Sequence, residues 1–136
     1  MDTTTTSRRR TAAAAGALAV AILLPLGVAA PAHANDDDVI RRGSCSGATD
    51  WKLKASPEDG RIEVEGEIDS NRVGQTWRWR LRHNGALSAK GTATTKAPSG
   101  SFEVRRVVVD APGTDKLVFR ARNPRTDEVC RGVVRF

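Results

Sequence analysis

The residue types that supply most enzyme chemistry are scarce in this chain. Its 136 residues include two histidines and two cysteines. His83 has no zinc-ligand spacing with either cysteine, and the chain has no phosphate-cradling glycine loop or metal-hydrolase motif. A nucleophile–base set would need a serine and a carboxylate brought to His83. His83 directly precedes Asn84-Gly85, a pair that predicts a two-residue hairpin turn, and is expected to be exposed. The sequence therefore predicts a non-enzymatic protein with no cofactor, metal or catalytic residues.

The amino-terminal segment predicts export. Three arginines at 8–10 precede an apolar run at 12–30, and a small-x-small site ends at Ala34. We expect a signal peptide over 1–34, cleaved after Ala34, and a secreted, extracellular product. One alternative is an uncleaved membrane anchor, but Pro25, the many alanines and the Ala-His-Ala site favour cleavage. The other is twin-arginine export, but Thr11-Ala12 follows the arginines where large apolar residues would be expected, so general secretion is favoured.

Without that segment the net charge is modest. Cleavage removes three of the 22 Lys and Arg residues and one of the 16 Asp and Glu residues, which leaves 19 against 15. This mildly basic balance is too small to identify a polyanionic partner. Residues 35–38 are acidic and are expected to form a flexible lead-in to a single domain over 39–136.

The two cysteines predict one disulfide. Cys45 lies near the start of the exported part and Cys130 near its end. In an oxidising compartment an isolated pair of this kind is most simply bonded. The bond would constrain nearly the whole domain, and loop closure of this length contributes about 4–5 kcal/mol to stability.

The exported part lacks a sustained helical period, and apolar residues alternate with polar ones almost throughout. Seven or eight short strands near ten residues apart, with turn residues between them, predict a small antiparallel β-sandwich, immunoglobulin-like in architecture, with a small barrel as the alternative. The expected strands are 39–45, 48–55, 61–69, 75–83, 85–96, 101–110 (with a bulge at 105–106), 116–123 and 128–136.

Alternating Trp and Arg residues at 77–82 are the most informative pattern. In a strand these two types point to opposite faces, so they cannot form one stacking surface. A hairpin with 61–69 would set Glu65 against Arg80 on one face and Gly66 against Trp79 on the other. We therefore predict buried tryptophans and a solvent-facing Glu/Arg ladder that fixes the register.

A second basic group lies on the C-terminal strands, where acidic residues are few. If these arginines share one sheet face, they would form a positive patch without carboxylate partners. They are the candidate anion-binding residues: Arg105, Arg106, Arg120, Arg122 and Arg131, with Arg135 nearby.

Several runs of the exported part, including 43–47, 69–77 and 100–104, resemble a group of small, uncharacterised secreted actinobacterial proteins with an immunoglobulin-like β-sandwich. The resemblance implies export and the sandwich and adds no mechanism. The first function hypothesis is recognition of an extracellular protein or cell-envelope component through loops or a strand edge. The second is electrostatic binding of an anionic polymer, such as a wall polymer or nucleic acid. An enzyme of unrecognised type is the third hypothesis.

Overall fold

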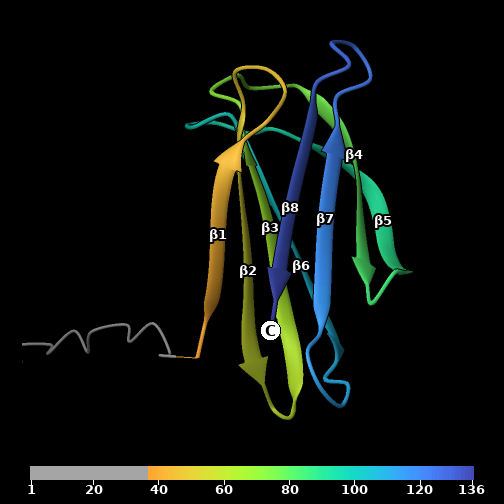
Figure 1. Ribbon diagram of the computed structural model, residues 1–136. Coiled ribbons are helices and arrows are strands. Elements are labelled where there is room, and N and C mark those ends of the chain that lie inside the picture. Colours follow the sequence, from red (N-terminus) through yellow and green to blue (C-terminus); the bar gives the residue numbers. More distant parts are fainter. Residues whose placement is uncertain (1–36) are drawn as a thin grey trace, which may run out of the picture. The chain divides into compact units, whose positions relative to one another are not determined.

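The computed structural model describes residues 37–136, and this part of the chain consists of strands and loops (Figure 1). Within it no helix is long and apolar enough to cross a membrane. The signal peptide predicted over 1–34 lies outside the described residues. The eight strands are β1 (Val39–Ser44), β2 (Asp50–Glu58), β3 (Arg61–Asp69), β4 (Thr76–His83), β5 (Ala86–Thr94), β6 (Ser101–Val109), β7 (Lys116–Arg122) and β8 (Val129–Arg135).

The strands form two antiparallel sheets that pack face to face. Sheet 1 has the order β1-β2-β3-β6, and sheet 2 has the order β5-β4-β7-β8. Alternate side chains of each strand point into the space between the sheets. Burial of their apolar surface there stabilises the packing of the two sheets. The prediction of a small antiparallel sandwich is confirmed. The largest fully buried apolar side chains are Leu53, Ile62, Ile68, Trp77, Leu117 and Phe119.

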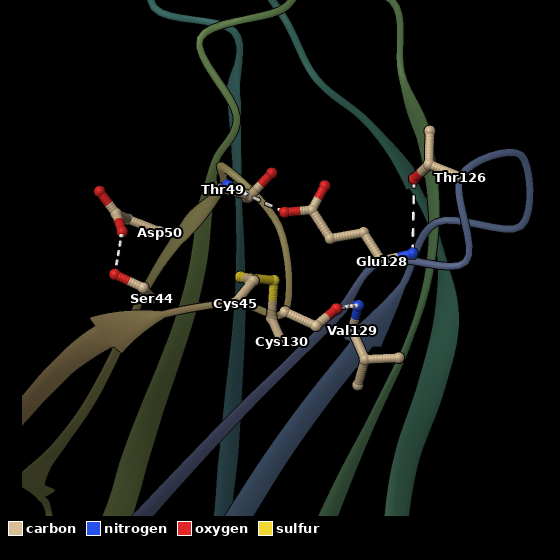
Figure 2. Close-up of a disulfide and its surroundings, with 9 residues drawn as sticks. Ser44, Cys45, Thr49, Asp50, Thr126, Glu128, Val129 and Cys130 are labelled. Atoms are coloured by element: carbon tan, nitrogen blue, oxygen red, sulfur yellow. Dashed lines mark hydrogen bonds between the residues drawn. A yellow bond between two sulfur atoms is a disulfide. The ribbon is translucent and has the colours of Figure 1, made fainter.

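The predicted disulfide is confirmed, and it joins the two sheets. Cys45 directly follows β1 of sheet 1, and Cys130 lies in β8 of sheet 2 (Figure 2). Backbone contacts surround it: the Ser46 amide donates to the Val129 carbonyl at 2.9 Å, and the Val129 amide donates to the Ser46 hydroxyl at 2.9 Å. The bond therefore closes the side of the sandwich where β1 and β8 meet.

Two of the three tryptophans lie deep in the core, as the alternation predicts. Trp77 is 0% exposed and Trp79 is 5% exposed, whereas Trp51 is half-buried. The Trp79 ring covers Gly91, where an added Cβ would lie 2.9 Å from the indole. The expected partner glycine was Gly66, which is instead covered by Phe119.

The predicted hairpin between 61–69 and 75–83 is wrong. β3 pairs with β2 and β6, and β4 pairs with β5 and β7, so the two strands belong to different sheets. The connection between them crosses from one sheet to the other and is fixed at both ends. The Ser70 hydroxyl donates to the Gly100 carbonyl at 3.0 Å, and the Gly74 amide donates to the Thr95 carbonyl at 2.8 Å. The Glu/Arg ladder therefore does not exist.

The β4–β5 hairpin predicted at Asn84-Gly85 is confirmed. Both turn residues have the positive φ that a tight hairpin turn requires, 49° and 87°. The bulge predicted at 105–106 is absent, because the β3–β6 register runs unbroken. Arg106 consequently shares the inward face of Val64 and lies over the Trp79 ring, 5.0 Å from its centroid. The described part has a bulge elsewhere, between Leu81 and Arg82.

Candidate anion-binding face

The outer face of sheet 2 begins with β4. Trp77, Trp79 and Leu81 point into the core, so the residues between them point to solvent. β7 pairs with β4 so that Arg122 lies opposite Arg78 and Arg120 lies opposite Arg80. Residues directly opposite in an antiparallel pair share a face. Cationic side chains on two adjacent strands therefore meet.

The outer strands of sheet 2 extend this arrangement. Lys90 of β5 lies opposite Arg80, and Arg131 of β8 lies opposite Arg120. Neighbouring strands are about 4.8 Å apart. One row of cations, which we call the central row, thus crosses the whole sheet in the order Lys90, Arg80, Arg120, Arg131.

Every charged residue on this face of the sheet 2 strands is a cation. Above and below the central row the same register places further arginines and lysines. We call the whole surface the basic face. Its members are Arg78, Arg80, Arg82, Lys90, Lys116, Arg120, Arg122, Arg131 and Arg135.

Ion pairs leave most of this charge uncompensated. Among residues 37–136, the one ion pair on the basic face joins Arg122 to Asp127 of the loop before β8. Arg82 is held differently, since its guanidinium donates to the Gly85 carbonyl at 2.8 Å. The four cations of the central row have no carboxylate partner within the described part of the chain.

Both burial and neighbouring charge oppose the positive charge of Arg120. Its side chain is half-buried, and burial together with the positive charges of Arg80 and Arg122 lowers the pKa of Arg120 from its ordinary value. Folding has thus placed a cation where both desolvation and like charge oppose it. An anion bound beside it would offset the repulsion from Arg80 and Arg122 and compensate the partly desolvated charge.

The basic face is hollowed on both sides of the Arg80–Arg120 pair. One open hollow of about 610 Å³ reaches Lys90, and a second of about 370 Å³ reaches Arg131. Arg80 and Arg120 line both hollows. The central row therefore runs through both hollows, with Arg80 and Arg120 shared between them.

The outer face of sheet 1 contrasts with this. There Lys52 pairs with Glu67, and Arg105 pairs with Glu65 at 2.6 Å. A hollow of about 520 Å³ on that face is lined by both signs of charge. Sheet 1 therefore offers mixed, mutually compensated charge, and the positive potential of the domain is concentrated on sheet 2.

The structure divides the candidate residues predicted from sequence. Arg120, Arg122 and Arg131 gather on the basic face. Arg105 lies on sheet 1 among carboxylates, and Arg106 points toward the core edge, so neither belongs to it. Sequence reasoning missed the arginines of β4 and Lys90 because it assigned the former to the Glu/Arg ladder. A signal was present: no acidic residue occurs between Asp69 and Glu103.

His83 is not the exposed turn residue expected from sequence. Its side chain is 16% exposed and pairs with the fully buried Asp115. Asp115 also accepts from the Asn84 amide at 2.8 Å and from the Ala111 backbone N–H at 3.0 Å. These contacts tie the β4–β5 turn to the loop before β7. No group of three His, Cys, Asp or Glu side chains positioned to hold a metal ion occurs among residues 37–136.

Comparisons with protein-family models, curated proteins and solved structures find no match to this chain. The geometry and charge of the basic face are the features of the described residues that bear on function.

Replacing Arg120 by Gln should stabilise the fold. The change removes a half-buried cation between Arg80 and Arg131 and breaks no ion pair. Relief of cross-strand repulsion predicts a gain of about 0.5 kcal/mol in the free energy of unfolding at low salt, shrinking at high salt because ions screen the repulsion. Thermal unfolding at two NaCl concentrations measures it. The control Lys52→Gln, which breaks the pair with Glu67, should give no gain. A less stable Arg120→Gln at low salt would contradict the electrostatic description.

Proposed function

We propose that this protein is an exported, non-enzymatic binding module that holds an anionic polymer on its basic face. The observation that carries the proposal is the central row: four cations on four adjacent strands, none paired with a carboxylate in the described chain. A folded protein places like charges side by side at a cost, since direct cross-strand repulsion is destabilising. A bound polyanion would neutralise these charges, so the same cations that repel one another in the free protein would contribute to binding.

Export is part of the proposal, and the signal pattern at 1–34 and the disulfide support it. Disulfides persist mainly in oxidising compartments, and this one is buried at Cys130. An exported basic module would meet polymers outside the cytoplasm, such as those of a cell envelope. The ligand would therefore be an extracellular polyanion.

Recognition of an extracellular protein is the second candidate. It is favoured by Val107 and Val109 on edge strand β6, which are 39% and 67% exposed. A strand edge with exposed apolar side chains can pair with an added strand. We rank it second because the apolar area is small, whereas the basic face spans a whole sheet.

Binding of a fluorescent inorganic polyphosphate, followed by anisotropy at several NaCl concentrations, tests the proposal. Counterion release predicts that log Kd rises linearly with log salt, with a slope of about 3 for four contacts. The double variant Arg80→Gln/Arg120→Gln should weaken binding at least tenfold and reduce the slope by about 1.5. The matched control Arg42→Gln/Arg61→Gln removes the same charge from sheet 1 and should leave the affinity within about threefold. Equal losses in both variants would show that only net charge matters and would overturn the assignment of the face.

A further inference from the structure

The charge on the basic face is distributed unevenly among its cross-strand rows. The central row is cationic on all four strands. On one side the register gives Thr92, Arg78, Arg122 and Val129, and Arg122 is already paired with Asp127. On the other side it gives Leu87, Arg82, Val118 and Val133, and beyond these Lys116 lies opposite Arg135 on β7 and β8 alone. The central row is therefore the one row with an unpaired cation on all four strands of the described sheet, and it runs perpendicular to the strands.

The two hollows together span the central row. The larger reaches Lys90 and the smaller reaches Arg131, and both are lined by Arg80, Arg82 and Arg120. A chain lying through both hollows would pass all four cations of the central row in order. A chain lying along β4 would meet Arg78, Arg80 and Arg82, but the guanidinium of Arg82 is held by the Gly85 carbonyl.

Two features of the row define the chemistry of its ligand. The backbones that carry neighbouring cations of the row are about 4.8 Å apart, closer than the roughly 6.8 Å between alternate residues of one strand. Three of the four are arginines, whose planar guanidinium donates two parallel hydrogen bonds to phosphate. The row thus suits a chain of closely spaced phosphates.

The basic face also lacks a stacking platform. Trp77 and Trp79 point inward; Trp79 borders the larger hollow, but it is only 5% exposed and its ring lies against Gly91 and Arg106. No other aromatic residue borders the two hollows of the basic face in the described part of the chain. Single-stranded nucleic-acid sites combine a basic groove with aromatic side chains on which bases stack. A ligand without bases needs no stacking contacts, whereas the bases of an oligonucleotide would find no aromatic partner on this face.

Building on the proposed function, we propose that the ligand is a linear, densely charged phosphate polymer without bases, and that it lies across the strands along the central row. The flanking arginines contribute long-range attraction. Lys90 and Arg131 at the two ends are therefore specific contacts, even though they lie on the edge strands β5 and β8.

Two matched double variants test the direction of binding, since each removes two cations and keeps Arg80 and Arg120. Lys90→Gln/Arg131→Gln shortens the central row, and Arg78→Gln/Arg82→Gln shortens the line along β4. We expect the first to weaken inorganic polyphosphate binding about tenfold or more and the second less than about threefold. Thermal unfolding confirms that both variants are folded. Equal losses, or a larger loss in the second, would overturn the proposed path while leaving polyanion binding intact.

Competing probes test the ligand class. At equal phosphate concentration, wild-type protein should bind inorganic polyphosphate more tightly than oligothymidylate and more tightly than vesicles containing anionic phospholipid. Tighter binding of the oligonucleotide or of the vesicles would overturn the ligand class. Failure to bind any of the three probes would instead overturn the proposed function itself.

Discussion

The double variant Cys45→Ala/Cys130→Ala should lose about 2–5 kcal/mol in its free energy of unfolding. The disulfide joins residues 85 positions apart and connects sheet 1 to sheet 2. Without it, the unfolded chain regains the freedom that this long closed loop removes. The substitution at Cys130 also leaves a small gap, because that side chain is 0% exposed.

Urea denaturation of the oxidised protein and of the double variant measures this effect. The folded variant should keep its β-sheet circular dichroism spectrum, because two hydrogen bonds between Ser46 and Val129 remain, one of them accepted by the Ser46 hydroxyl. The bond from the Thr49 amide to the Glu128 carboxylate also remains (Figure 2). A destabilisation below about 1 kcal/mol would show that the two sheets are held together without the covalent link.

Replacing Asp115 by Ala should cost about 3 kcal/mol. Asp115 is fully buried and accepts hydrogen bonds from His83, Asn84 and the Ala111 amide. Alanine would leave these three donors without their acceptor in a place that water does not reach freely. The control Asp110→Ala removes an exposed carboxylate from the same loop region and should change stability by less than about 0.5 kcal/mol.

The cost of losing Asp115 should depend on pH. Burial alone would raise the pKa of Asp115, but the hydrogen bonds from His83, Asn84 and Ala111 and the charge of His83 hold it below its ordinary value. A carboxyl group whose pKa is lowered by folding stabilises the protein above its unfolded pKa, and this stabilisation is lost as the pH falls through the folded value.

Urea denaturation from neutral pH into the acid range below about pH 4 should therefore show the wild type and Asp115→Ala converging. A difference that stays constant across that range would contradict the ionised state assigned to Asp115.

The strands themselves were predictable because each carries its own signal. Strict alternation over 61–69 and 76–83 predicts two strands and the inward direction of Trp77 and Trp79. The Asn84-Gly85 pair predicts the tight turn that joins β4 to β5 in a hairpin. These are local properties: they depend on the period of two and on which residues tolerate positive φ.

The pairing of strands was not predictable in the same way. A register that satisfied both faces of 61–69 and 75–83 existed, yet the chain places these strands in different sheets. Alternation says which way a side chain points and leaves open which strand lies beside it. The choice is made by contacts between distant loops, such as Ser70 with Gly100 and Gly74 with Thr95.

The wrong strand pairing conceals the three arginines of β4, because a glutamate partner for Arg80 would compensate its charge. Position on the C-terminal strands, where acidic residues are few, also groups Arg105 and Arg106 with the arginines of β7 and β8, although β6 belongs to sheet 1. A cluster made across strands is visible only when the order of strands in each sheet is known.

Mapping of the backbone amide signals by NMR during titration with inorganic polyphosphate tests the central claim most directly. We predict that the largest shifts fall on the residues of the central row and their neighbours in β4 and β7, and that they fade as NaCl is raised. The outer residues of β2 and β3 should change little. Shifts centred on sheet 1 or on the β6 edge, or no saturable shifts at low salt, would contradict the assignment of the basic face as the binding site.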